Sequence, residues 1–353
     1  MQLVFAKSIT TSQQRENKQS RIIIMFDLQP LNIAEKIVEE GRSFLSSEET
    51  CELFAIPAER TLELILGADS IRRKFKKNSA FTCSIVNAKS GSCPENCAFC
   101  PQSVHHQTNI SNYPLMTIDE LVAAAKNMTA AGAGKFGIVT SGSQLNDEEL
   151  SRICRAATII RRETPLAVCA STGMLNASMA QRLAQSGVTT FHHNLETARS
   201  FFHNICTTHE YDEDLQTIAH VQAAGMKICS GGILGLGETW EQRVELAFTL
   251  KELAVDRIPL NFLNPLAGTR MENMPLLPPM EALKSIALFR YVHPEKDITI
   301  CGGREITLRD YQSWIFAAGA NGVMIGNYLT TQGRSATMDL AMIKEFNLTK
   351  DEN

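Results

Sequence analysis

From about residue 80 onward the chain repeats one unit, in which a short β-branched apolar run precedes a loop and an amphipathic segment with helical spacing. Strands are predicted at Phe81–Val86, Lys135–Thr140, Leu166–Ala170, Thr189–His192, Lys227–Ile233, Arg257–Phe262, Asp297–Cys301 and Gly322–Ile325. Helices between them are predicted at Thr117–Ala131, Asp147–Arg162, Asn176–Ser186, Tyr211–Ala224, Trp240–Leu253, Pro279–Tyr291 and Asp310–Ala318. This alternation favours an α/β fold of the (β/α)8 TIM-barrel type over 76–335. An open parallel sheet is the alternative, because periodicity alone does not show whether a sheet closes.

Helical spacing also precedes the repeated units. Ala34, Ile37 and Val38 recur at helical intervals, so residues 25–75 are predicted to form helices packed before the barrel. Residues 1–24 are polar and irregular, and are expected to be disordered or to lie upstream of a true start at Met25. Residues 336–353 are expected to form a C-terminal helix or tail.

Composition narrows the function classes. The 353 residues are 44% apolar and 20% charged, as in globular domains, and the net charge of −4 offers no basic field for nucleic acid. No apolar run approaches the ~18–20 residues that span a bilayer, so no membrane partner is expected. Ten cysteines without a convincing export signal predict a cytoplasmic protein with metal or redox chemistry.

Three cysteines lie within eight residues, in the loop after the first predicted strand. Cys93, Cys97 and Cys100 supply three thiolates, the usual ligands of iron–sulfur clusters. A four-iron cubane held by three ligands keeps one iron open for a small molecule. A zinc site or chance clustering are the alternatives, but structural zinc sites usually close with a second paired motif, and none is nearby.

Further cysteines gather at the ends of predicted strands. Cys169, Cys229 and Cys301 lie at or inside the ends of three different strands, and Cys206 follows the fourth strand in a loop. Chemistry on TIM barrels occurs at this face, so these four cysteines are predicted to hold a second, auxiliary cluster. Alternatively they are merely buried thiols. Ordinary packing is expected of the other three, Cys51, Cys83 and Cys154.

The C-x3-C-x2-C spacing resembles the radical S-adenosylmethionine (AdoMet) enzymes, and longer strings resemble biotin synthases. These strings are Cys93-Pro-Glu-Asn-Cys97, Cys100-Pro-Gln-Ser103, His193-Asn-Leu-Glu-Thr197, Lys227-Ile-Cys-Ser-Gly-Gly-Ile233, Gly235-Leu-Gly-Glu-Thr239 and Gly319-Ala-Asn-Gly322. The similarity runs in order from about Ile37 to beyond Thr331. It implies a radical enzyme that inserts sulfur into dethiobiotin, with a [4Fe–4S] cluster whose open iron binds AdoMet and an auxiliary cluster as the sulfur source. A flavodoxin or ferredoxin as electron donor and a homodimer are further expectations from the family.

The resemblance also implies roles for individual residues. Asn194 and Glu196 match AdoMet-contacting positions, and the backbone around Ser230, Gly231, Gly232 and Ile233 matches the lining of the cofactor site. The expected substrate-binding residues are His192, Asn194, Asn261, Thr330 and Thr331.

Several positions depart from the familiar pattern, in which three cysteines and an arginine hold a [2Fe–2S] cluster. Gly137 stands in place of one of those cysteines and Thr299 in place of the arginine, whereas Cys206 and Cys301 are added. This combination resembles divergent biotin synthases of anaerobes, with a four-iron auxiliary cluster. Asp214 stands where an arginine near the AdoMet carboxylate is usual.

Two other function classes stay open. One is a related radical AdoMet enzyme on the same scaffold, similar to the maturases of hydrogenase cofactors. The other is a non-catalytic iron–sulfur carrier, although a carrier needs neither an open iron nor an AdoMet pocket.

Overall fold

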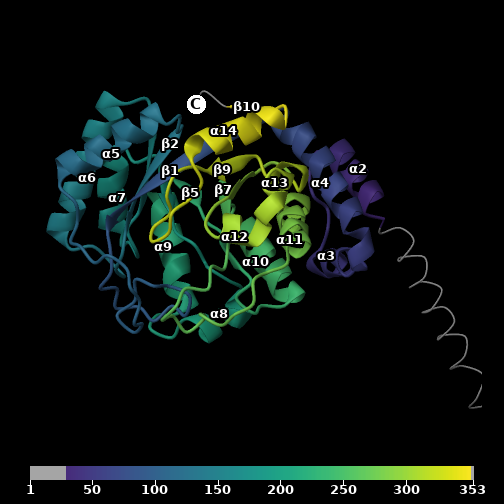
Figure 1. Ribbon diagram of the computed structural model, residues 1–353, viewed down its shortest axis with the longest axis horizontal. Coiled ribbons are helices and arrows are strands. Elements are labelled where there is room, and N and C mark those ends of the chain that lie inside the picture. The colour runs from purple at the N-terminus through teal and green to yellow at the C-terminus, as the bar shows by residue number, and fades with distance from the viewer. Residues whose placement is uncertain (1–28, 351–353) are drawn as a thin grey trace, which may run out of the picture.

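The computed structural model describes residues 29–350, whose centre is a closed barrel of parallel strands (Figure 1). Its strands are β1 (Ser79–Lys89), β2 (Lys135–Thr140), β3 (Ala167–Ser171), β4 (Thr190–His192), β5 (Lys227–Cys229), β6 (Gly232–Leu234), β7 (Arg257–Phe262), β8 (Asp297–Ile300) and β9 (Gly322–Met324). The barrel closes because β9 pairs with β1, with Phe81 opposite Gly322 and Cys83 opposite Met324. The predicted (β/α)8 fold is confirmed, and the open sheet is excluded.

One predicted strand is divided. The stretch predicted at Lys227–Ile233 forms β5 and β6, which occupy a single place in the barrel beside β7. The interruption lies at Ser230 and Gly231, where the backbone passes so close to β7 that a Cβ on Gly231 would stand 1.9 Å from the carbonyl oxygen of Pro259.

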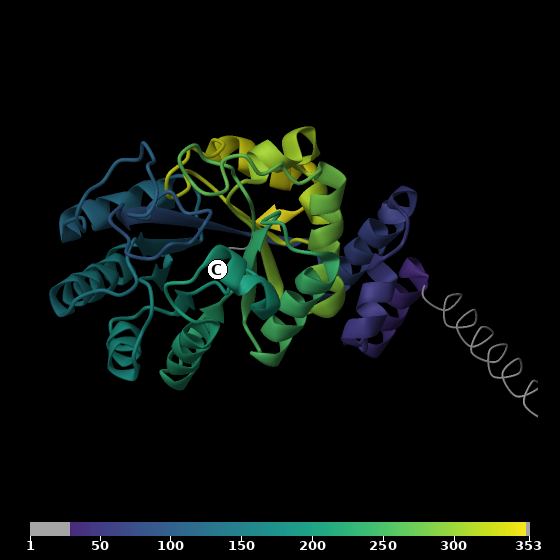
Figure 2. The same cartoon turned by 90° about the horizontal axis from the view of Figure 1, so that it is seen from below.

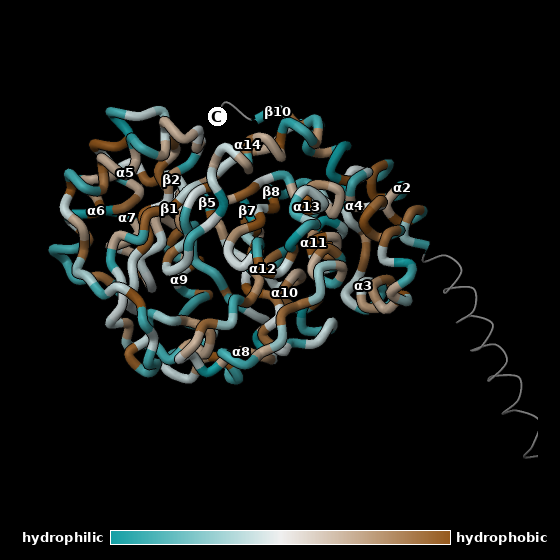
Figure 3. The backbone as a smooth tube through the Cα atoms, in the orientation of Figure 1, coloured by the Kyte–Doolittle hydropathy of each residue, from teal (hydrophilic) through white to brown (hydrophobic). Residues whose placement is uncertain are grey.

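Helices surround the barrel (Figure 2). They are α5 (Ile118–Ala130), α6 (Asp147–Glu163), α7 (Ala177–Gln185), α8 (Arg199–Ile205), α9 (Tyr211–Ala223), α10 (Trp240–Glu252), α11 (Pro279–Val292), α12 (Arg304–Leu308) and α13 (Trp314–Ala317). Local sequence sets several starts: Thr117 and Glu120 form a reciprocal capping box on α5, as Asn146 and Glu149 do on α6. Hydrophobic and hydrophilic stretches alternate along the surrounding helices (Figure 3).

The helix predicted at Asp310–Ala318 is replaced by two short turns of helix. Arg309 adopts a left-handed φ of 47°, and the chain forms the 3₁₀ turn η2 (Arg309–Tyr311) before α13. The positive φ of Arg309 ends α12 just before the predicted helix, and the predicted helix itself is divided at Gln312 and Ser313, between η2 and α13.

Three N-terminal helices pack against one side of the barrel's outer layer. They are α2 (Pro30–Glu40), α3 (Ser47–Phe54) and α4 (Thr61–Lys76), joined by the 3₁₀ turn η1 (Ala58–Arg60). The Tyr291 hydroxyl of α11 donates to the carbonyl oxygen of Pro30 at 2.9 Å, and buried Arg72 donates to that of Phe316 at 3.0 Å. Together the three helices cover 30–76, and the predicted extension at 1–24 lies outside the described residues.

The C-terminal segment returns to the start of the barrel. Helix α14 (Ala336–Glu345) is followed by β10 (Thr349–Lys350), which pairs in parallel with the first residues of β1. Asp339 of α14 and Arg304 of α12 form a fully buried ion pair at 3.0 Å. No helix within 29–350 is long and apolar enough to cross a membrane.

Candidate active site

A cavity of about 460 Å³ occupies the barrel and opens at the carboxyl ends of the strands. Its mouth is lined by the loop that follows β1, and its floor by the first residues of β2 and β7, Lys135 and Arg257. Most predicted site residues line it: Cys93, Cys97, Cys100, Cys169, Cys229, Cys301, His192, Asn194, Glu196, Ile233, Asn261, Thr330 and Thr331. The cavity therefore joins residues that are more than two hundred positions apart in the chain.

The first group of thiols comes from the loop after β1. Backbone hydrogen bonds fold this loop back on itself, from Cys93 to Gln102 at 3.0 Å and from Val104 to Cys93 at 2.8 Å. Burial raises the pKa of Cys93, and it raises that of Cys100 to about 12. These clustered thiols resist ionisation when no cation is near. A positively charged iron centre would stabilise them as thiolates, the form that binds the metal. All ten cysteines are free of disulfides.

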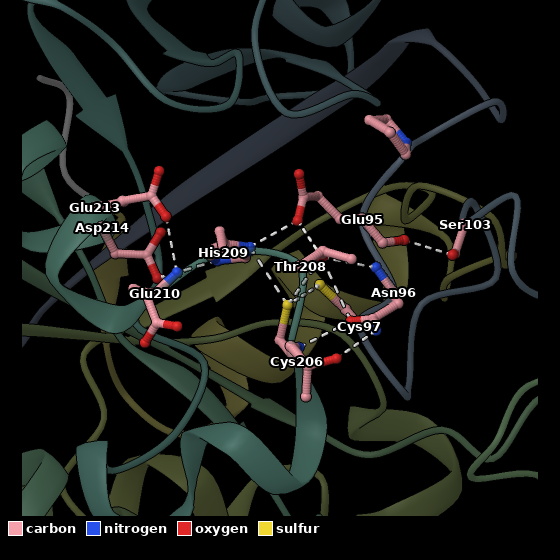
Figure 4. A network of polar contacts seen from close by, with 12 residues as sticks. Glu95, Asn96, Cys97, Ser103, Cys206, Thr208, His209, Glu210, Glu213 and Asp214 are labelled. Carbon is pink, nitrogen blue, oxygen red and sulfur yellow. Dashed lines mark hydrogen bonds and ion pairs between the residues drawn. The ribbon is translucent and has the colours of Figure 1, made fainter.

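Cys206 lies with this first group and not with the strand-end cysteines. Its Sγ stands 3.8 Å from Cys97 Sγ and 3.3 Å from His209 Nδ1 (Figure 4). Cys206 directly follows α8. The Ala98 amide donates to the carbonyl oxygen of Ile205 at 2.7 Å, and this bond holds the end of α8, and with it Cys206, against the loop that carries Cys97. The prediction that Cys206 converges with Cys169, Cys229 and Cys301 is therefore corrected.

A second group of thiols lies deeper in the barrel, on β1, β3, β5 and directly after β8. It contains Cys83, Cys169, Cys229 and Cys301, whose side chains all line the cavity. A hydrogen bond between Cys83 and Cys301 lowers the pKa of Cys83 and raises that of Cys301. Burial raises the pKa of Cys169 and Cys229.

Cys83, which the sequence assigned to ordinary packing, lines the cavity together with the other three thiols of this group. Phe81 and Ile85, two positions before and after Cys83 on β1, also line the cavity, as does Ser84, so the alternation along β1 was a partial signal that the Cys83 side chain points inward. Gly137 of β2 stands opposite Cys169 of β3, and because it has no side chain it leaves room beside that thiol.

Two cations that the sequence reading missed lie beneath the second thiol group. Lys135 Nζ stands 4.0 Å from the centre of the Phe81 ring, and Arg257 pairs with Asp297 at 3.4 Å. Their positive charges oppose the burial that raises the pKa of Cys169 and Cys229. An anionic group held by these thiols would be stabilised by the same charges.

The segment after β4 carries the predicted AdoMet contacts. Asn194 donates to Glu196 at 3.2 Å and accepts from the Gly231 amide at 3.1 Å. Burial raises the pKa of Glu196 to about 8. Ser230, Gly231 and Gly232 lie behind the cavity wall, and a Cβ on Gly232 would stand 2.4 Å from the carbonyl oxygen of Glu196. These glycines permit close approach of backbones, and only Ile233 of this stretch lines the cavity.

The predicted substrate residues surround the upper cavity. Asn261 accepts from the Gly302 amide at 2.9 Å and donates to the carbonyl oxygen of Gly232 at 3.3 Å, so its amide is fixed in orientation. Burial lowers the pKa of His192 to about 4, which keeps the imidazole neutral. Thr330 and Thr331 approach from the loop after β9.

Asp214, the position where the family usually has arginine, is engaged by two histidines. Its carboxylate lies 2.8 Å from His193 Nε2 and 3.4 Å from His209 Nε2. Burial disfavours the charged form of His209, but the pKa of His209 is still raised to about 11, and the hydrogen bond to Asp214 contributes most to that rise. The carboxylate is thus neutralised within the protein.

Comparisons with known proteins agree with this geometry. The Radical SAM superfamily model matches residues 89–250, and the Biotin and Thiamin Synthesis associated domain matches 259–349. The chain is 56% identical to the biotin synthase of Syntrophus aciditrophicus over 312 residues, covering 88% of this chain and 96% of that protein. It is 51% identical to the biotin synthase of Geotalea daltonii, covering 90% and 96%.

Solved structures show the same fold at low sequence identity. Methylornithine synthase PylB superposes with a TM-score of 0.79 at 17% identity, covering 91% of this chain and 97% of PylB. HydG, a maturase of the [FeFe]-hydrogenase, gives 0.78 at 15% identity, covering 94% and 79%. The high identity to curated relatives over nearly their whole length shows that the chain belongs to the biotin synthases, sulfurtransferases of the radical AdoMet superfamily.

Proposed function

We propose that this chain converts dethiobiotin to biotin in the barrel cavity, with the two thiol groups as the ligands of two separate iron–sulfur clusters. Cys93, Cys97 and Cys100 would hold the AdoMet-binding [4Fe–4S] cluster at the mouth. The deeper set, Cys83, Cys169, Cys229 and Cys301, would hold the auxiliary cluster. When bound, these clusters supply the electron that cleaves AdoMet and the sulfur that enters the substrate.

The two thiol groups lie at different depths of one cavity, and this arrangement supports the proposal most directly. The space between them is lined by His192, Asn194 and Asn261, from β4, the segment after it, and β7. A substrate in this space would face AdoMet on one side and the sulfur source on the other. The closed barrel wall would exclude water from the reacting carbons.

The side chains between the clusters would bind and orient the substrate. Asn261, fixed by its bonds to Gly302 and Gly232, would present remaining amide lone pairs and protons to the ureido ring. The hydroxyls of Thr330 and Thr331 would reach the substrate carboxylate from the loop after β9. Glu196, with a pKa of about 8, would be protonated near neutral pH and able both to donate to and accept from the AdoMet ribose.

A four-thiolate auxiliary set carries more negative charge than the three cysteines and one arginine of the familiar enzyme. Lys135 and Arg257 beneath Cys169 and Cys229 would offset that charge. Four thiolates are the usual ligands of both [2Fe–2S] and [4Fe–4S] clusters, so the four-iron auxiliary cluster proposed here rests on the resemblance to the divergent biotin synthases of anaerobes, with Thr299 at the arginine position.

The remaining expectations concern the cellular setting. The protein would work in the cytoplasm as a homodimer and take electrons from a flavodoxin or ferredoxin. Its domains would be an N-terminal extension (1–24), N-terminal helices (25–75), the radical AdoMet barrel (76–335) and a C-terminal helix with its tail (336–353).

Anaerobic incubation of the reconstituted, reduced protein with AdoMet and dethiobiotin tests the proposal. Biotin and 5′-deoxyadenosine are expected from the wild-type chain. Alanine at Cys93, Cys97 or Cys100 is expected to abolish both products, because two thiolates no longer fix the open iron. Production of 5′-deoxyadenosine without biotin by the wild-type chain would refute the sulfurtransferase assignment.

A further inference from the structure

Glu95, Cys206 and His209 form a compact group beside the first thiol group, and none of the three is a proposed ligand of either cluster (Figure 4). One ligand atom from each, a carboxylate oxygen, a sulfur and an imidazole nitrogen, lies within 4.8 Å of the other two. Cys206 is buried, and the side chains of Glu95 and His209 are only 15% and 12% exposed. The group is therefore largely shielded from bulk water.

The three donors point at one position. His209 Nδ1 stands 2.7 Å from Glu95 Oε2 and 3.3 Å from Cys206 Sγ, so a single Nδ1 proton lies between two acceptors. A tetrahedral ion with bonds of about 2.0–2.3 Å separates its ligands by roughly 3.3–3.8 Å. Replacing the shared proton by such an ion requires Glu95 and His209 to move apart by less than about 1 Å.

The far side of His209 is oriented as in metal sites. Its Nε2 lies 3.4 Å from Asp214 Oδ2, and Asp214 is itself fixed by His193 at 2.8 Å. Histidine ligands in proteins commonly direct their second nitrogen to a carboxylate, which sets the tautomer and holds the ring in place.

The two loops that carry the donors are already fastened together. Besides the bond from Ala98 to Ile205, Asn96 accepts from the Thr207 amide at 2.9 Å and donates to the Thr207 hydroxyl at 2.7 Å. Arg270 donates to the carbonyl oxygens of both Asn96 and Ile205 at 2.9 Å. The donor atoms thus need little further ordering to bind an ion.

We propose that Glu95, Cys206 and His209 bind one divalent metal ion of the zinc or ferrous type, separate from both iron–sulfur clusters. A thiolate, an imidazole and a carboxylate are the donors that such borderline ions accept. The ion would join the cluster-binding loop to the connection between α8 and α9.

The spacing of Cys206 from Cys97 argues against Cys206 as a further ligand of the first cluster. Their two sulfurs lie only 3.8 Å apart. Thiolates on two irons of one cubane lie roughly 6–7 Å apart, for bonds of ~2.3 Å. Cys206 is therefore placed beside a cluster ligand and not at another corner of that cluster.

The test uses the protein with both clusters assembled, so that the cluster cysteines are occupied. It is incubated anaerobically with Zn²⁺, passed through a desalting column, and analysed for zinc and iron. About one zinc per chain is expected with iron unchanged, and Cys206→Ser and His209→Gln are each expected to lose it. Cys154→Ser on α6 and His203→Gln, an exposed histidine on α8, are matched controls that keep the zinc.

Zinc K-edge absorption of the loaded protein is expected to show sulfur together with nitrogen or oxygen ligands. Zinc no higher than in the two variants, zinc that enters only as iron leaves, or a zinc shell without sulfur would each overturn the proposal. The circular dichroism and iron content of each variant confirm folding, and the second variant gives an independent result if one does not fold. No biotin measurement enters the test, so its failure is distinct from failure of the proposed activity.

Discussion

Replacing Cys83 by alanine gives the sharpest test of the auxiliary ligand set. Cys83 is hydrogen-bonded to Cys301 inside the barrel, whereas Cys206 lies beside Cys97 at the mouth. If Cys83 is a ligand, its loss leaves three thiolates for the auxiliary cluster. The paired variant Cys206→Ala leaves all seven proposed cluster ligands in place.

The expected effect on the fold is small. Removing one sulfur from a partly exposed position in the cavity costs on the order of 1 kcal/mol, comparable with a buried methylene. Natural domains are stable by about 5–15 kcal/mol, so the barrel persists. The effect on iron is large, because two four-iron clusters give about eight irons per chain and loss of one leaves about four.

Iron and sulfide analysis after anaerobic reconstitution measures the difference, with 5′-deoxyadenosine and biotin as the second readout. Cys83→Ala is expected to retain AdoMet cleavage, to hold about four irons and to form no biotin. Cys206→Ala is expected to hold about eight. Full iron content and full biotin yield from Cys83→Ala, with loss of both in Cys206→Ala, would show that the sequence-based grouping was right and the structural one wrong.

Three further outcomes follow from single contacts. Asp339→Ala removes one partner of the fully buried pair with Arg304 and is expected to lower the free energy of unfolding by about 3–5 kcal/mol. The control Asp310→Ala, at an exposed position, is expected to change it by less than about 0.5 kcal/mol. Similar thermal or urea unfolding of the two variants would contradict this. Glu196 has a folded-state pKa of about 8 against a reference value of 4.5, so between these pH values the folded protein keeps a proton that the unfolded chain loses. The free energy of unfolding is therefore expected to fall by up to about 5 kcal/mol as pH rises from 4.5 to 8. Glu196→Gln should remove this pH dependence, and an unchanged pH dependence would exclude Glu196 as its source. Arg257→Gln removes a cation beneath the thiols proposed to hold the auxiliary cluster. In an EPR-monitored redox titration, the reduction potential of the auxiliary cluster is expected to fall while that of the first cluster stays unchanged. Equal shifts in both potentials would argue for a general structural effect.

The sequence determined most of the barrel because its signals are local. Apolar runs with β-branched residues, followed by capped amphipathic segments such as Thr117–Ala131 and Asp147–Arg162, predicted strands and helices within a few residues of their positions. The three cysteines of the first group lie within one loop, so their proximity needed no knowledge of the tertiary structure.

Contacts between distant segments were decided only by the tertiary structure. The pairing of β10 with β1 joins residues some 270 positions apart, and no local pattern specifies it. Likewise, the helix that the apolar spacing favoured at 310–318 is divided at Gln312 and Ser313, between η2 and α13, and no local pattern marked that break.

The exchange of Cys83 for Cys206 has the same origin. A cysteine on a strand faces the barrel interior or the outer helices according to strand register and barrel closure, and both faces of a parallel strand are apolar. A cysteine in a loop goes where the loop is fastened, here by the hydrogen bonds of Asn96 and Ala98 to the segment 205–208. The sequence supplied the thiols, and only the closed barrel and its paired loops divided them between the two sites.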